Sequence, residues 1–202
     1  MKKLLLIVFV LNVFIVNAQQ PTQKISVIAY YAGDAAHIDA YPVEKLTHII
    51  FSFCHLQGNE LHVDNKNDSL TIQHLVELKQ RNSSLKIILS LGGWGGCKTC
   101  SPVFSTDKGR KEFAASVKQL NDYFKTDGID IDWEYPGMIG DSNVYRPEDK
   151  QHYTVLFKEL REGLNNLSLI TRMKYYVTTA VGDLRVILII QKWIKCSSIP
   201  IT

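Results

Sequence analysis

The sequence has no marked excess of either charge and no compositional break. Its 23 lysine and arginine residues stand against 20 acidic residues, which gives the 202-residue chain a formal charge of +3. This balance does not indicate a partner that binds through charge, so we expect no nucleic-acid partner. Low-complexity linkers and internal repeats are also absent from the sequence, which therefore gives no sign of a second folded domain.

Long hydrophobic runs are absent except at the start of the chain. Lys2 and Lys3 precede a mainly apolar run at residues 4–16, and Val-Asn-Ala ends at residue 18. A basic start, an apolar centre and a small residue before a cleavage point are typical of a secretory signal peptide. The run is short for a membrane span, which needs about 20 residues. We expect residues 1–18 to be a signal peptide, the protein to be secreted (extracellular or periplasmic), and no membrane span to remain after cleavage.

Cysteine is scarce, with four residues in the whole chain. An exported protein meets oxidising conditions, so we interpret Cys97 and Cys100, in the segment C-K-T-C, as a local disulfide. A thiol-redox motif is the alternative for this spacing. Two cysteines alone do not make a zinc site, and the sequence assigns no partner to Cys54 or Cys196.

Short apolar segments rich in β-branched residues alternate with amphipathic helical patterns. We expect strands at 24–31, 46–53, 85–94, 127–135 and 174–182. We expect helices at 69–81, capped by Asp68 or Ser69, at 107–125 and at 148–164. This alternation predicts an α/β fold in which helices cover a parallel sheet. Two architectures fit it: an open doubly wound sheet and a (β/α)₈ TIM barrel.

The phosphate-binding glycine motifs of doubly wound folds are missing. The segment S-L-G-G-W-G-G-C at residues 90–97 is rich in glycine, but it has neither the G-x-G-x-x-G spacing nor that of a P-loop. Its simplest interpretation is a turn that needs positive φ angles. In a barrel, polar groups at the carboxyl ends of the strands form the active site. Tyr30, Ser90 and Glu134 end expected strands, which favours the barrel.

An unusual acidic pattern lies in the segment T-D-G-I-D-I-D-W-E-Y-P-G, residues 126–137. Alternate residues of a strand share one face, so Asp130, Asp132 and Glu134 are expected to form a column of carboxylates. Buried carboxylates cost several kcal/mol unless they are paired or protonated, and neighbouring acids share protons at raised pKa values. A carboxylic acid protonated near neutrality can act as a general acid. A solvent-exposed polar face and a metal site built on Asp-x-Asp are the alternatives.

These residues also carry a resemblance. The spacing D-x-x-D-x-D-x-E at residues 127–134, together with S-x-G-G at 90–93, resembles glycoside hydrolase family 18, the chitinases and chitinase-like proteins. The resemblance extends from about residue 25 to residue 182. It implies hydrolysis of β-1,4 bonds in N-acetylglucosamine polymers, with chitin or its oligosaccharides as the partner and no metal or organic cofactor.

The resemblance also implies roles for single residues. Glu134 would be the general acid and then the base, Asp132 would hold the N–H of the substrate's 2-acetamido group, and Asp130 would share a proton with Asp132. The acetamido oxygen would attack the anomeric carbon, so that the configuration is retained. Asp127 would shape the entrance of the strand. The residues implied to contact or support the substrate are Tyr30, Ser90, Gly92, Gly93, Trp94 and Tyr135.

The sequence also departs from the family pattern. A complete barrel needs about 250 residues, and no segment matches the family's tyrosine after strand six or its tryptophan on strand eight. No acidic residue follows Asp183, which is consistent with a frameshift or an early stop. We therefore expect a barrel truncated after about five strands, with its catalytic part at 19–182, an atypical tail at 183–202, and poor folding or weak activity. A non-catalytic glycan-binding protein and a metal-dependent sugar transferase are the alternative functions.

Overall fold

The computed structural model describes residues 25–180, and the expected signal peptide and the tail at 183–202 lie outside this range. Five parallel strands are hydrogen-bonded in the order β1-β2-β4-β5-β6, and the short strand β3 pairs antiparallel with β2. The strands are β1 (Ile28–Tyr31), β2 (His48–Gln57), β3 (Glu60–His62), β4 (Lys86–Gly92), β5 (Gly128–Asp132) and β6 (Tyr176–Thr179).

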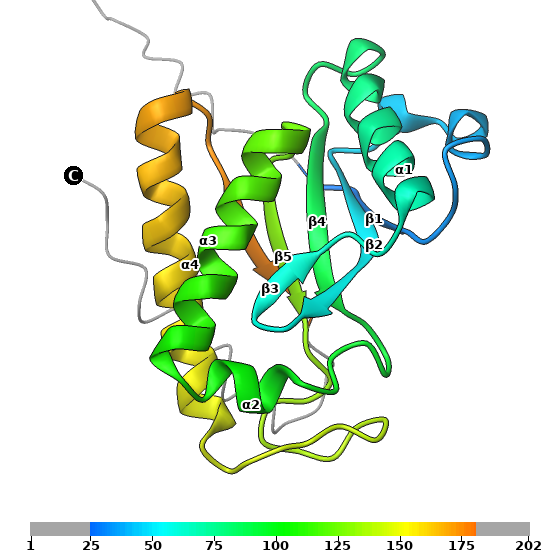
Figure 1. The fold of residues 1–202 in the computed structure, drawn as a ribbon. Coiled ribbons are helices and arrows are strands. Elements are labelled where there is room, and N and C mark those ends of the chain that lie inside the picture. The colour runs from blue at the N-terminus through cyan, green and yellow to red at the C-terminus, as the bar shows by residue number, and fades with distance from the viewer. Residues whose placement is uncertain (1–24, 181–202) are drawn as a thin grey trace, which may run out of the picture.

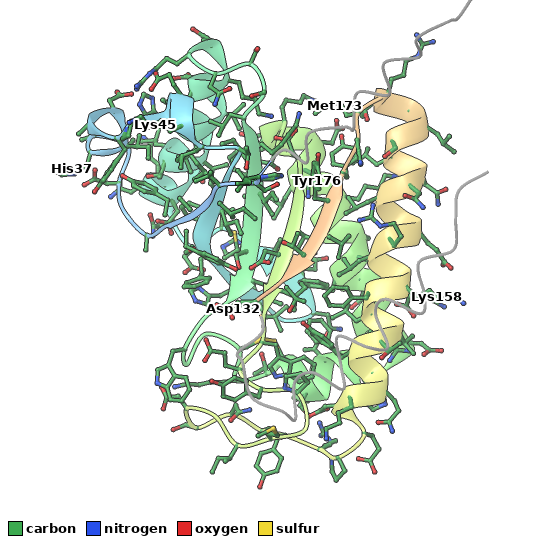
Figure 2. All side chains as sticks on the ribbon, turned by 180° about the vertical axis from the view of Figure 1, so that it is seen from behind. His37, Lys45, Asp132, Lys158, Met173 and Tyr176 are labelled. Carbon is green, nitrogen blue, oxygen red and sulfur yellow. A yellow bond between two sulfur atoms is a disulfide. The ribbon has the colours of Figure 1, made fainter. Side chains whose placement is uncertain are left out.

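The main helices lie on one face of this sheet. Figure 1 shows α3 in front of the strands, with α4 to its left and α1 to its right, and in the reverse view of Figure 2 no helix of the described part covers the other face. The helices are α1 (Lys66–Glu77), α2 (Cys100–Phe104), α3 (Asp107–Phe124) and α4 (Asp149–Thr171), with 3₁₀ turns at Ile38–Ala40, Val43–Lys45 and Leu78–Gln80.

The strand order decides between the two expected architectures. A doubly wound sheet reverses its strand order at a switch point and carries helices on both faces. Here the parallel strands follow one another in chain order, and the described helices cover one face. This is the arrangement of consecutive β/α units in a barrel, whose inner face carries no helices.

The two faces of the sheet differ in chemistry because successive strand residues point to opposite sides. The face towards the helices is apolar: Ile49, Leu89, Ile129 and Ile131 are all fully buried there. Burying a side chain of this size contributes about 1.5–3 kcal/mol, so this face holds the main core. Trp133 extends it beyond the end of β5, with its ring centroid 5.6 Å from that of Phe104 and 5.9 Å from that of Tyr153.

Several boundaries differ from those expected. α1 begins at Lys66 because the Asn65 side chain, and not Asp68 or Ser69, caps it by accepting a hydrogen bond from the Asp68 amide at 3.0 Å. α4 continues past residue 164 to Thr171 because Leu167 adds a further buried position. β3 and α2 were not expected. No helix among residues 25–180 has the length and hydrophobicity needed to cross a membrane.

Candidate active site

A buried carboxylate, Asp130, lies at the centre of the site. It is only 1% exposed, and hydroxyl groups from three other strands donate hydrogen bonds to it. Tyr30 in β1 and Ser90 in β4 donate to Oδ2 at 3.1 and 2.9 Å, and Thr178 in β6 donates to Oδ1 at 2.7 Å. Ser90 and Thr178 are the register neighbours of Asp130 on either side. These bonds offset the cost of burying the carboxylate.

Asp132 occupies the last position of β5, on the same face as Asp130. Figure 2 shows it at the end of the sheet opposite Tyr176, which begins β6; this is the carboxyl end of the parallel strands. Burial, and then the negative charges of Glu134 and Asp130, raise the pKa of Asp132 to about 6. This carboxyl therefore exchanges its proton close to neutral pH, as proton-transfer chemistry requires.

Glu134 lies just beyond the strand and not within it. The expected strand at 127–135 ends at Asp132, so a column of three acids along one strand was wrong for its third member. The loop that follows folds back on Glu134, since a Cβ atom at Gly140 would be 2.0 Å from the Glu134 carbonyl oxygen. The Glu134 carboxylate still acts on both neighbouring side chains, because its charge contributes to the raised pKa values of Asp132 and Tyr135.

Two glycines of the S-x-G-G motif let the end of β4 approach β5 closely. Gly92 and Gly93 have φ angles of 111° and 78°, which residues other than glycine rarely adopt. A Cβ atom at Gly92 would be 2.2 Å from the Asp132 carbonyl oxygen, and one at Gly93 would be 2.5 Å from the Phe53 ring. The Gly93 amide donates to the Asp132 carbonyl at 3.0 Å. The motif therefore positions the backbone of the acid strand.

Two aromatic side chains stand on the loops above this edge. Trp94 is 65% exposed, and its ring meets that of Tyr135 edge-on with 6.4 Å between centroids. Aromatic faces exposed next to acidic groups offer apolar surface for stacking against a ligand ring.

A disulfide joins Cys97, in the loop that follows Trp94, to Cys100, the first residue of α2. This loop meets the loop after β5, because the Val144 amide donates to the Lys98 carbonyl at 3.4 Å. Cys54 is a buried thiol, and burial raises its pKa.

Asp127 lies at the amino end of β5, away from Asp132 at the carboxyl end. It precedes β5, is 2% exposed, and accepts a hydrogen bond from the Ile87 amide at 2.8 Å. Lys79 and Lys86 place their ammonium groups 2.6 and 3.7 Å from its carboxylate oxygens. Asp127 therefore ties β5 to β4 where the strands begin, a structural position that fits the role expected for it.

Thr178 was not among the expected site residues, although the sequence carried a signal for it. The segment 174–182 was expected to be the strand that follows the acid strand along the chain, and a polar residue on its inner face would have been a candidate. In the described part of the chain, no group of three or more histidine, cysteine, aspartate or glutamate side chains is arranged to hold a metal ion.

Solved structures share this fold. The family 18 N-acetylglucosaminidase of Paenibacillus barengoltzii superimposes with a TM-score of 0.73 and 29% identity, over 84% of this chain and 51% of the other. The chitinase domain of the spore coat protein CotE of Clostridium difficile gives a TM-score of 0.69 and 30% identity, over 86% and 47%. The predicted α/β barrel fold is thereby confirmed, and the described part is a partial barrel.

Curated relatives are similar in sequence. Chitinase A1 of Niallia circulans is 43% identical over 112 residues, which are 55% of this chain and 16% of the relative. The endochitinase of Manduca sexta is 30% identical over 165 residues, 73% of this chain and 29% of the relative. The chain thus spans less than a third of the length of these two relatives. The sequence profile described as Glycosyl hydrolases family 18 matches residues 26–197, and the chain belongs to this family.

Proposed function

We propose that this chain is a secreted chitinase-type hydrolase, which cleaves β-1,4 bonds between N-acetylglucosamine units with retention of configuration. The observation that carries the proposal is the order of the three acids. Asp130 is held by three hydroxyl donors, Asp132 follows with its pKa raised to about 6, and Glu134 stands at the open end of the strand. The relatives' names, chitinase and endochitinase, support the substrate class.

In the first step Glu134 donates its proton to the glycosidic oxygen, and the bond from that oxygen to the anomeric carbon breaks. The carbonyl oxygen of the substrate's own 2-acetamido group forms the new bond to this carbon, which gives a cyclic oxazolinium ion. Asp132 accepts a hydrogen bond from the acetamido N–H and orients the group for attack. This substrate-assisted route is the known exception to a carboxylate nucleophile.

In the second step the Glu134 carboxylate takes a proton from water, and the water oxygen attacks the anomeric carbon. The ring of the oxazolinium ion opens, the acetamido group is restored, and two inversions leave the configuration unchanged. Asp130 supports both steps by sharing a proton with Asp132. Trp94 and Tyr135 supply apolar faces on which sugar rings stack.

Replacing the general acid tests the proposal. Glu134→Gln keeps the shape of the side chain but cannot donate a proton, so hydrolysis of a chromogenic chitotriose substrate should fall by about 10²–10⁴-fold. Binding of chito-oligosaccharide, measured by calorimetry, should persist. Glu162→Gln makes the same change on the exposed surface of α4 and should leave the rate unchanged.

The outcomes separate the alternatives. Full activity in Glu134→Gln would refute the assigned acid. Oligosaccharide binding without any turnover in the unaltered chain would instead indicate a glycan-binding protein. Loss of activity on addition of a chelator would favour the metal-dependent transferase, because the mechanism above uses no metal.

Export is a separate part of the proposal, and it rests on the sequence of residues 1–18. Expression of the full chain in a secreting host should yield extracellular or periplasmic protein whose first residue, by N-terminal sequencing, is Gln19. Deletion of residues 2–18 should keep the protein in the cytoplasm. An unprocessed N-terminus on exported protein would contradict the cleavage site.

A further inference from the structure

A further buried carboxylate lies in the first turn of α4, outside the row formed by Asp130, Asp132 and Glu134 (the acid row). Asp149 is fully buried, and it accepts a hydrogen bond on Oδ1 from the Ser101 hydroxyl of α2 at 2.8 Å. Its Oδ2 atom accepts from the backbone amides of Arg146 at 2.7 Å and Gly137 at 3.4 Å. The Arg146 guanidinium in turn donates to the Ser101 hydroxyl at 2.7 Å. One side chain thus joins two helices and the loop between β5 and α4.

This loop, residues 133–148, is the one that carries Glu134. Gly137 is three residues beyond Glu134 and has a φ angle of 75°, so the chain turns sharply at the point that Asp149 holds. Further along, the Gly140 amide donates to the Asn143 side chain, whose own amide group donates to the Met138 carbonyl at 3.2 Å. These bonds are internal to the loop and do not attach it to the helices.

A simple helix cap would not need this set of partners. A carboxylate at a helix N-terminus ordinarily binds amides of the first turn of its own helix. The amide partners of Asp149 lie before the helix, at Arg146 and Gly137, and its hydroxyl partner belongs to α2. A fully buried carboxylate is costly to leave unpaired, so moving the loop away would remove bonds that the burial requires.

We propose that Asp149 is a positioning residue, which fixes the loop at Gly137 and Arg146 and thereby sets the place of Glu134 beside Asp132. The inference rests on the proposed function for its catalytic meaning, since Glu134 is the acid there. Its structural content, the attachment of the loop and the effect of Glu134 on Asp132, can be tested without substrate.

The test uses the full chain and three variants. Asp149→Asn replaces one acceptor oxygen by an N–H₂ group that cannot accept, Ser101→Ala removes the α2 donor while keeping the carboxylate, and Glu148→Gln removes a neighbouring exposed charge at the same helix end as the control. Amide hydrogen exchange measures how firmly the loop amides are held. Exchange at Gly137 and Arg146 should rise by about 10- to 100-fold in Asp149→Asn, the loss expected for bonds to a charged acceptor.

Carboxyl ¹³C NMR then measures the titration of Asp132 in the acid row. In Asp149→Asn the titration midpoint of Asp132 should fall, because a displaced Glu134 no longer adds its charge to the raised pKa. Ser101→Ala should move both readouts in the same direction by less, and Glu148→Gln should move neither. If Asp149→Asn does not fold, Ser101→Ala alone decides the question.

Two results would overturn the inference. Unchanged exchange at Gly137 and Arg146 would show that Asp149 does not hold the loop. Faster exchange with an unchanged Asp132 titration would show that it holds the loop without placing Glu134. An unaltered chain that hydrolyses no chitotriose would refute the proposed function, but both readouts would still test Asp149.

Discussion

Thr178 provides the sharpest test of how the site is held together. Its hydroxyl donates to Oδ1 of Asp130 at 2.7 Å, while Tyr30 and Ser90 both donate to Oδ2. Thr178→Val keeps the shape of the side chain but leaves Oδ1 without this donor. Because Asp130 is 1% exposed, water does not readily take the place of the hydroxyl. A hydrogen bond to a charged group contributes about 1.5–3 kcal/mol, and we expect the free energy of unfolding to fall by that amount.

The geometry also predicts how the variants around Asp130 rank in their cost to the free energy of unfolding. Ser90→Ala leaves Tyr30 still bonded to Oδ2, so its cost should be smaller, about 0.5–1.5 kcal/mol. Asp130→Asn replaces the carboxyl group that accepts the Thr178 hydroxyl, so adding Thr178→Val to it should cost less than Thr178→Val alone. Urea unfolding followed by circular dichroism measures all of these. Thr154→Val on the exposed side of α4 is the control for the loss of a threonine hydroxyl.

A Thr178→Val variant whose unfolding free energy stays within about 0.5 kcal/mol of the unaltered chain, the usual scatter of surface changes, would refute this role of Thr178. The role would equally be refuted if Ser90→Ala cost more than Thr178→Val. Either result would mean that the Asp130 carboxylate finds other donors, and that three-strand bonding is not what makes its burial tolerable.

Two further predictions concern the acid strand and the glycine turn beside it. The pKa of Asp132 is raised to about 6 from about 3.9 in an unfolded chain. The folded chain therefore binds this proton more tightly than the unfolded chain does. The stability gained in this way is complete below about pH 3.9 and is lost as the pH rises through 6. Asp132→Asn should therefore gain stability relative to the unaltered chain between pH 4 and 7, and equal pH profiles in urea unfolding would contradict this. Gly92→Ala, whose Cβ would be 2.2 Å from a carbonyl oxygen, should cost at least about 1–3 kcal/mol. Gly163→Ala, with nothing within 4 Å in a helix interior, should stabilise by about 0.5–1 kcal/mol, and the opposite order of these two variants would contradict the close approach.

Sequence patterns predicted the long elements well and the short ones poorly. The helix expected at 107–125 is observed as α3, Asp107–Phe124, because its apolar period is sustained over several turns. β3 has three residues and was not expected, although Gly58 with its φ of 61° marks the hairpin turn before it. What stabilises β3 is distant in sequence: the Leu61 amide donates to the Ser116 hydroxyl of α3 at 2.8 Å. No local pattern contains that contact.

The site was predictable in its residue types but not in its connections. Asp130 and Asp132 stood out because acids alternate there with isoleucine, and the common face follows from strand geometry alone. The sequence pattern did not predict that Glu134 lies off the strand. β5 ends at Asp132, where the loop that Asp149 holds begins. No sequence pattern singles out Asp149, and only the folded loop shows that it accepts hydrogen bonds from amides outside its own helix.

The hydrogen bonds of Asp130 connect the candidate site to the folding of the sheet. Its hydroxyl donors lie 100, 40 and 48 residues away in sequence, so none of them is near it until β1, β4 and β6 have paired into one sheet. Before that point the carboxylate remains in water at no cost, and after it the same group is buried and needs all three donors. Correct strand register is therefore a condition for burying the acid. A one-residue slip of β6 would turn Thr178 to the opposite face and leave Oδ1 unpaired. The burial of Asp130 therefore favours the register in which Ser90 and Thr178 lie beside it.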